Sequence, residues 1–229
     1  QIFRMNQRSN LLLIVTDQQS AQAMSCSGNP HLHTPAMDAL AARGTRFERA
    51  YCCYPLCTPA RTAQMTGRYP HRFGIHGNEG RFFWHHDIPR EQLLGHHLAQ
   101  AGYRCAWAGK DMPPADGSRD FELLCPWGDH QAAQRAADFL QQPQDRPFCL
   151  AVNFVDPHNI CEWARGTALP EGELPPEPAL AALPLEPILL REVTLMQGLD
   201  LREIAASLKV IFAGGAVLPP SMRRVIERD

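Results

Sequence analysis

Residues 57–68 read CTPARTAQMTGR and place a cysteine and an arginine at the start of a predicted helix. The first turn of a helix has backbone N–H groups without intrahelical partners and carries the positive end of the helix dipole, so Cys57 would lie where an anion binds. Arg61 follows one turn later on the same face, and its guanidinium group suits a tetrahedral oxyanion. The pattern predicts an anion site that contains a nucleophile.

A cysteine in such a place has other interpretations. A thiolate nucleophile would need a histidine base, for which His71, His76 and His158 are candidates. A cysteine and an arginine alone are also typical of a buried thiol beside a surface ion pair. The rest of the sequence must therefore decide what Cys57 does.

Polar residues follow three predicted strands. The apolar run LLLIV at 11–15 leads into Asp17, a short strand leads into Lys110, and FCLAVNFV at 148–155 leads towards His158. Short apolar runs of this kind are typical of strands buried in a parallel sheet. Ligands bind at the carboxyl ends of such strands, so we expect a site there.

Helical segments alternate with these strands. Segment 34–47 has Pro35 at its first helical position and Gly44 as its stop, and helices are also predicted in the first part of 91–110 and over 130–142. The alternation predicts an α/β fold with a mainly parallel sheet sandwiched by helices.

The string at 57–68 resembles the sulfatase signature, in which a cysteine or serine, any residue, a proline, a small residue and an arginine precede a threonine-glycine-arginine group. Three further stretches resemble the family in the same order. LLLIVTDQQ carries Asp17, LAQAGYRCAWAGK carries Lys110, and FVDPHNICEWARG carries His158. The chain is thus similar to sulfatases over about residues 10–185, which implies a truncated domain of the alkaline phosphatase-like superfamily.

The resemblance implies a modified nucleophile and a metal ion. In sulfatases the cysteine is oxidised to formylglycine by a formylglycine-generating enzyme, and Arg61 would hold the modified Cys57. A divalent cation, Ca²⁺ or Mg²⁺, would be bound by Asp17, by Gln18 and by an oxygen of the modified Cys57, as a hard cation prefers.

The resemblance also implies the reaction. Lys110 would neutralise charge on the sulfate oxygens, and His158 would give a proton to the leaving alcohol. The expected activity is hydrolysis of a sulfuric ester of a small molecule or sugar.

Three departures from the family pattern keep two alternatives open. Met112 stands where sulfatases usually have a histidine, and the aspartate motif that completes the metal site is not found between residues 184 and 229. Gln18 in place of a second aspartate is also a feature of phosphonate and phosphate monoester hydrolases in the same superfamily. The alternatives are therefore such a hydrolase, or a catalytically inactive sulfatase-like fragment that at most binds an anion.

The composition changes in the last quarter of the chain. Residues 170–187 are rich in proline and glutamate and predict an extended arm. Residues 188–229 are expected to be an unrelated tail. Its part SLKVIFAGGAVLPPSMRRVIER resembles a strand, glycine turn and helix of adenylate-forming acyl-CoA ligases, and equally fits any such unit.

Composition excludes some partners. The formal net charge is −2 and no long basic run occurs, so we expect neither nucleic acid nor an anionic membrane as a partner. No apolar run reaches the roughly 20 residues of a membrane helix, and the first residues lack a signal-peptide core, so we expect a cytoplasmic protein. The cysteines lack metal-ligand spacing, and we expect reduced, buried thiols such as Cys105, Cys149 and Cys161.

Overall fold

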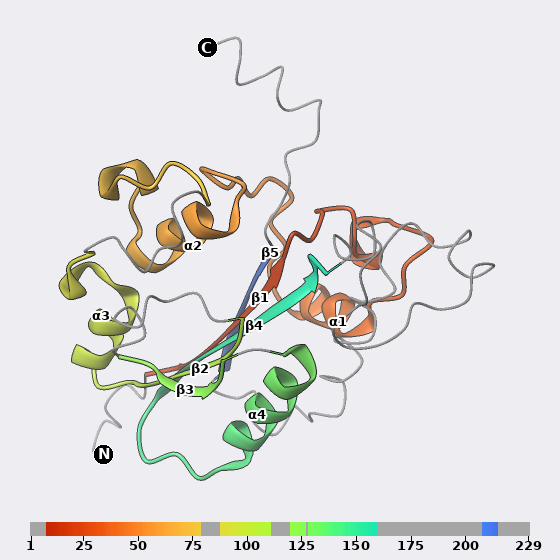
Figure 1. The fold of residues 1–229 in the computed structure, drawn as a ribbon. Helices are drawn as coiled ribbons and strands as arrows, with labels where there is room; N and C mark the ends of the chain where they lie inside the picture. Colours follow the sequence, from red (N-terminus) through yellow and green to blue (C-terminus); the bar gives the residue numbers. More distant parts are fainter. Residues whose placement is uncertain (1–7, 79–87, 111–119, 127, 160–207, 215–229) are drawn as a thin grey trace, which may run out of the picture.

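The computed structural model describes residues 8–78, 88–110, 120–126 and 128–159, and the backbone of residues 208–214. Five strands form one sheet in the order β3-β2-β4-β1-β5, and every neighbouring pair is parallel. The strands are β1 (Asn10–Asp17), β2 (Arg104–Gly109), β3 (Glu122–Cys125), β4 (Phe148–Pro157) and β5 (Leu208–Gly214). All five therefore end at the same edge of the sheet (Figure 1).

Helices cover both faces of the sheet. The α-helices are α1 (Pro35–Arg43), α2 (Cys57–Thr66), α3 (Leu94–Gln100) and α4 (Asp129–Gln141), and short 3-10 helices lie at Ser25–Ser27, Pro70–Phe73 and Arg90–Gln92. Helix α4 packs on one face, over β2, β3 and β4, while α2 and α3 lie on the other face (Figure 1). This arrangement confirms the predicted α/β fold with a parallel sheet between helix layers.

Strand β4 lies in the middle of the core and is buried along its whole length. Its alternate residues face opposite layers: Leu150 and Val152 pack in the cluster beneath α4, whereas Cys149 and Ala151 pack in the cluster beneath α2 and α3. A strand covered on both faces gains stability from apolar residues at every position, which explains the continuous run FCLAV.

Most predicted elements match the structure, with shifted ends. The helix predicted within 34–47 is α1, which ends at the predicted stop, where the Gly44 N–H donates to the Leu40 carbonyl. The helix predicted from residue 91 begins only at Leu94, after a 3-10 turn. The strand predicted in the tail is β5, which pairs with β1 along its length. The predicted arm at 170–187 and the helix predicted after the glycine turn lie outside the described residues.

The described cysteines differ in burial, and Cys53 is exposed rather than buried. Cys105 and Cys149 are buried, and burial raises the pKa of their thiols to about 11 and about 12. The described cysteines are all free thiols, and Cys161 lies outside the described residues.

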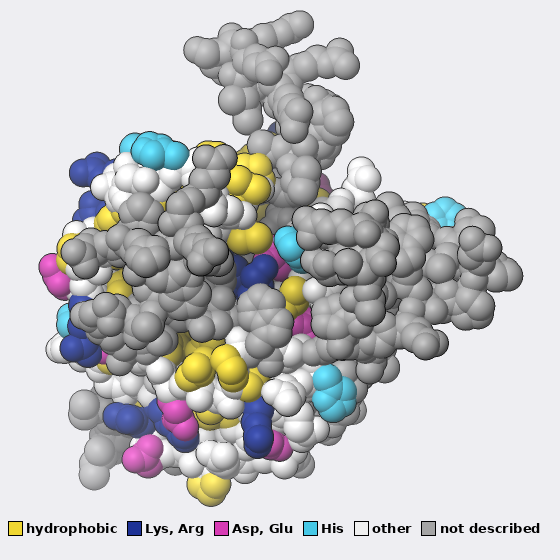
Figure 2. Space-filling model, viewed as in Figure 1, with side chains coloured by type: hydrophobic (Ala, Val, Ile, Leu, Met, Phe, Trp, Pro, Cys, Tyr) yellow, Lys and Arg dark blue, Asp and Glu magenta, His cyan; other side chains and the backbone are white. Residues whose placement is uncertain are grey.

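Charged side chains of both signs are visible on the surface (Figure 2). On the face drawn in Figure 2, the coloured basic and acidic side chains are dispersed among hydrophobic and polar ones. Among the described residues, no helix is both long and apolar enough to cross a membrane.

Candidate active site

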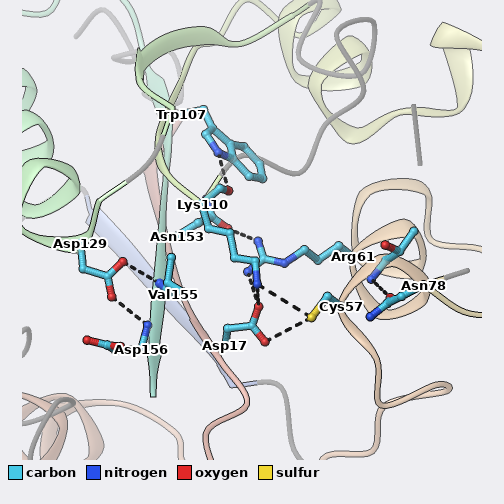
Figure 3. Close-up of polar contacts among 11 residues, drawn as sticks. Asp17, Cys57, Arg61, Asn78, Trp107, Lys110, Asp129, Asn153, Val155 and Asp156 are labelled. Carbon is cyan, nitrogen blue, oxygen red and sulfur yellow. Dashed lines mark hydrogen bonds and ion pairs between the residues drawn. The ribbon is translucent and has the colours of Figure 1, made fainter. Parts of the chain in front are cut away.

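Four predicted site residues meet at the carboxyl edge of the sheet. Asp17 ends β1, Lys110 follows β2, and Cys57 and Arg61 come from the first turns of α2 (Figure 3). The strands bring Asp17 and Lys110 together because parallel strands share one carboxyl edge. Arg61, which the simpler interpretation placed on the surface, is instead 5% exposed.

The four side chains form one connected cluster. The Cys57 sulfur lies 3.7 Å from Asp17 Oδ1 and 3.8 Å from Lys110 Nζ. Lys110 Nζ donates to Asp17 Oδ2, and an Arg61 Nη2 atom lies 3.6 Å from the same oxygen. Two cations and one carboxylate thus surround the sulfur, so an anion in place of the thiol would be attracted.

The start of α2 offers fewer backbone donors than the sequence suggested. The Thr58 N–H donates to Asn78 Oδ1 at 3.1 Å, Pro59 has no N–H, and the Ala60 N–H donates to the Leu56 carbonyl at 2.9 Å. An anion beside Cys57 would therefore be held mainly by the side chains of Arg61 and Lys110, and less by the helix N–H groups.

Electrostatics keep Asp17 ionised. Burial alone would raise the pKa of its carboxyl group, but the charges of Lys110 and Arg61 outweigh burial, and the pKa lies below the ordinary value. The charge of His158 lowers it further, which places that residue within electrostatic reach of Asp17. Asp17 can thus act as a fixed negative charge in the site.

The Cys57 thiol has the opposite tendency. Burial, followed by the negative charge of Asp17, raises the pKa of this thiol, and the opposing charges of Lys110 and Arg61 do not cancel the rise. A thiol with a raised pKa is a poor thiolate nucleophile at neutral pH. The candidate bases His71 and His76 are both exposed, and the contacts found for the Cys57 sulfur are with Asp17 and Lys110.

Sequence reasoning missed Asn153, which accepts hydrogen bonds from both cationic residues of the site, Arg61 and Lys110. Its Oδ1 accepts a hydrogen bond from Arg61 Nη1 at 2.9 Å, and its backbone carbonyl accepts the Lys110 N–H at 2.7 Å. Gly109 lets this carbonyl approach, because a Cβ at that position would lie 2.0 Å from the Asn153 oxygen. The only signal in the sequence was one polar residue inside the apolar run 148–155.

Sequence reasoning also missed Asp129, the first residue of α4. Its carboxylate accepts the N–H groups of Val155 and Asp156 at 2.6 and 2.8 Å (Figure 3). The sequence gives no signal for this role, because an acidic residue in the first turn of a helix is common. Its carboxylate instead supports the end of β4, just before His158.

The proposed metal ligands are only partly assembled. Asp17 offers an oxygen next to Cys57, and Gln18 follows it in a left-handed conformation with φ of 62°. Within the part of the chain that the structure describes, no three His, Cys, Asp or Glu side chains form a metal-binding group. These residues alone do not provide the six or more oxygens that Ca²⁺ prefers. Met112 lies outside the described residues.

The substitution Asp17→Asn should destabilise the protein in a pH-dependent way. It leaves Lys110 and Arg61 without their carboxylate, which costs about 3 kcal/mol of unfolding free energy near neutral pH. Because the folded-state pKa of Asp17 is depressed, its contribution is complete above the unfolded value near 3.8 and disappears as pH falls through the folded-state value. Urea unfolding of the wild-type and Asp17→Asn proteins between about pH 3 and about pH 7 should show that the difference in their unfolding free energies narrows as the pH falls. A constant gap would contradict this account.

The fold matches that of known proteins. A solved structure of a protein in the alkaline phosphatase superfamily from Vibrio parahaemolyticus has a similar fold, with a TM-score of 0.56 at 16% identity, covering 92% of this chain and 55% of that chain. A solved structure of a proposed sulfatase from Bacteroides thetaiotaomicron VPI-5482 matches with a TM-score of 0.71 at 19% identity, covering 91% of this chain and 58% of that chain. A phosphonate monoester hydrolase of Agrobacterium radiobacter matches with a TM-score of 0.63 at 17% identity, covering 91% and 62%.

The sequence comparisons define the family. The Sulfatase family model matches residues 9–168, so this chain belongs to the sulfatase family. One relative is the N-acetylglucosamine-6-O-sulfatase of Bacteroides thetaiotaomicron, which is 36% identical over 201 residues. The match covers 75% of this chain, which spans about a third (35%) of the length of that curated relative.

Proposed function

We propose that this chain carries the nucleophile half of a sulfuric ester hydrolase, with a formylglycine made from Cys57 by a formylglycine-generating enzyme. The observation that carries the proposal is the buried cluster at position 57. There the sulfur lies within 3.8 Å of the Lys110 ammonium and 3.7 Å of the Asp17 carboxylate, and Arg61 lies behind them. The membership of the sulfatase family supports the same conclusion.

The raised pKa of Cys57 favours the modified side chain over the thiol. An unmodified Cys57 would be mostly protonated at neutral pH, because burial and Asp17 both oppose the thiolate. Formylglycine at this position would supply a hydrated aldehyde, one hydroxyl of which is an oxygen nucleophile for sulfur. The neighbouring Asp17 is ionised and can accept a hydrogen bond from such a hydroxyl.

The remaining residues have roles that follow from their charge and place. Lys110 and Arg61 would stabilise negative charge on the sulfate oxygens as it develops, since both are held in a buried environment where charges interact strongly. His158 would donate a proton to the leaving alcohol, because it follows the neighbouring strand β4 at the same edge of the sheet and its charge acts on Asp17.

The proposed site would also bind a divalent cation, Ca²⁺ or Mg²⁺. Asp17, Gln18 and the modified side chain at position 57 would contribute oxygens to it. Lys110 donates to Asp17 Oδ2, and Asp17 Oδ1 lies next to the Cys57 sulfur, so the Asp17 carboxylate would be shared between Lys110 and the ion.

The proposed substrate is a sulfate ester of a sugar or another small molecule. The relative with 36% identity is an N-acetylglucosamine-6-O-sulfatase, which favours a sulfated sugar as the first substrate class to test. Two buried cations at the nucleophile suit the sulfate group of any such ester.

A phosphonate or phosphate monoester is the second candidate substrate. The observation that favours it is Gln18, which follows Asp17 where sulfatases often have a second aspartate. One fewer carboxylate leaves the site more positive, which suits a phosphate monoester, because its dianion carries more negative charge than a sulfate ester. The fold is also shared with a phosphonate monoester hydrolase.

The test begins with mass spectrometry of the chain co-expressed with a formylglycine-generating enzyme. Fragmentation of the tryptic peptide AYCCYPLCTPAR should place the mass loss of thiol-to-aldehyde conversion on Cys57, with Cys52 and Cys53 in the same peptide as internal controls. The converted chain should then hydrolyse an aryl sulfate faster than the matching aryl phosphonate ester.

Two results would overturn the proposal. An unmodified Cys57, beside a control substrate that is converted, would show that the signature is not read in this chain. A converted chain that binds inorganic sulfate but hydrolyses neither ester would be the inactive, anion-binding fragment instead.

A further inference from the structure

The ladder between β1 and β4 breaks at the candidate site. It runs residue for residue from Leu11 opposite Cys149 to Thr16 opposite Phe154, but Asp17 lies opposite Pro157. The ladder therefore skips Val155 and Asp156, which form a bulge at the end of β4. Bulges next to active sites redirect the side chains that follow them.

Asp129 accepts both N–H groups of this bulge. The Val155 N–H donates to Oδ1 at 2.6 Å, and the Asp156 N–H donates to Oδ2 at 2.8 Å. Asp129 is 1% exposed, so these bonds satisfy a carboxylate that water hardly reaches. Its place at the start of α4 also favours a negative charge, because the helix dipole is positive there.

One further hydrogen bond connects the bulge to His158. The His158 N–H donates to the Val155 carbonyl at 3.0 Å, so Asp129, Val155 and His158 are linked in series through the backbone. Pro157, which precedes His158, lies opposite Asp17 in the ladder. The bulge thus sets where His158 stands relative to the carboxylate of the site.

We propose that Asp129 is a positioning residue that holds His158 in place for proton transfer, by fixing the bulge at the end of β4. This inference rests on the proposed function, in which His158 gives a proton to the leaving alcohol. Asp129 itself lies on the α4 side of the strand and acts only through the backbone of Val155 and Asp156 (Figure 3).

The first arm of the test is hydrogen exchange, which needs no enzyme activity. In Asp129→Asn one acceptor oxygen becomes an NH₂ group that faces an N–H donor, so one of the two bonds is lost. Amide exchange at Val155 and Asp156 should speed up by about 10-fold or more, while the rest of β4 keeps its protection. Asp138→Asn, the same change on α4 at a half-exposed site, is the matched control and should leave these amides unchanged.

The second arm is the dependence on the leaving group. An alkyl sulfate has a poor leaving alcohol and needs the proton, whereas 4-nitrophenyl sulfate has a good one and does not. Asp129→Asn should lower kcat by about 10- to 100-fold for the alkyl ester and by less than about 3-fold for the aryl ester. In a His158→Ala background, the same change should have no further effect on the alkyl ester.

Each outcome decides the proposal. If Asp129→Asn lowers kcat equally for both esters, or lowers it by the full factor again in the His158→Ala background, Asp129 has a structural role only and the proposal is overturned. Unchanged exchange at Val155 and Asp156 would also overturn it. If the wild-type chain hydrolyses neither ester, the proposed function fails, and the exchange arm alone decides whether Asp129 fixes the bulge. If Asp129→Asn does not fold, Asp129→Glu keeps both acceptors, shifts the bulge, and should show the same ester selectivity.

Discussion

Cys57→Ala is expected to abolish ester hydrolysis by the converted chain, with a loss of kcat/KM on the order of 10⁴-fold or more. The alanine side chain can neither be oxidised to an aldehyde nor attack sulfur. The buried charges of Asp17, Lys110 and Arg61 remain, so the variant should still bind inorganic sulfate. The measurement is kcat/KM for an aryl sulfate, together with the sulfate dissociation constant from calorimetry.

Cys53→Ala is the matched control for this result. Cys53 lies in the same tryptic peptide and is exposed, so its loss should change neither conversion of Cys57 nor turnover. Residual hydrolysis in Cys57→Ala above that of buffer would mean that another group attacks the ester. A loss of sulfate binding in this variant would mean that the side chain at position 57, and not the two cations, holds the anion.

Gly109→Ala is expected to have the largest effect on folding. A Cβ at this position would lie 2.0 Å from the Asn153 carbonyl oxygen and 2.9 Å from the Ala132 Cβ, and the φ of 87° is strained for any side chain. Crowding and left-handed strain together should cost about 3 to 5 kcal/mol of unfolding free energy. In urea unfolding at about 25 °C, we expect this variant to be only marginally folded, or already unfolded without urea.

Gly102→Ala separates the two causes. Gly102 has a similar φ of 83°, but its added Cβ would meet only the end of the Arg8 side chain at 3.8 Å. This variant should lose only the strain energy, about 1 to 2 kcal/mol. Equal losses of unfolding free energy in both variants would show that backbone strain accounts for the whole effect. Crowding of the added Cβ against the Asn153 carbonyl oxygen would then contribute nothing.

The elements and the main site residues could be predicted because their signals are local. Apolar runs at 11–15 and 148–155 mark strands buried on both faces, and Asp17 and Lys110 come directly after strands. Once the strands are parallel, their carboxyl ends must share one edge, and Asp17 meets Lys110 because β1 and β2 both lie next to β4 in the sheet.

Asn153 and Asp129 could not be predicted because their partners depend on register. Asn153 reaches Arg61 only because it lies opposite Gly109 at the end of β2, and a shift of one residue would turn its side chain to the other face. Asp129 has its role only because the ladder with β1 skips two residues. Nothing in the local sequence of either residue reports such pairings.

The pairing of β1 has a consequence for how the chain folds during synthesis. β1 lies between β4 and β5, and its Leu12 pairs with both Leu150 and Val210. A ribosome that adds about 5 to 20 residues per second therefore releases β1 roughly 10 to 40 s before its outer partner. Throughout that interval the edge of β1 that later pairs with β5 has no strand partner in the nascent chain, and unpaired strand edges are where partly folded chains aggregate.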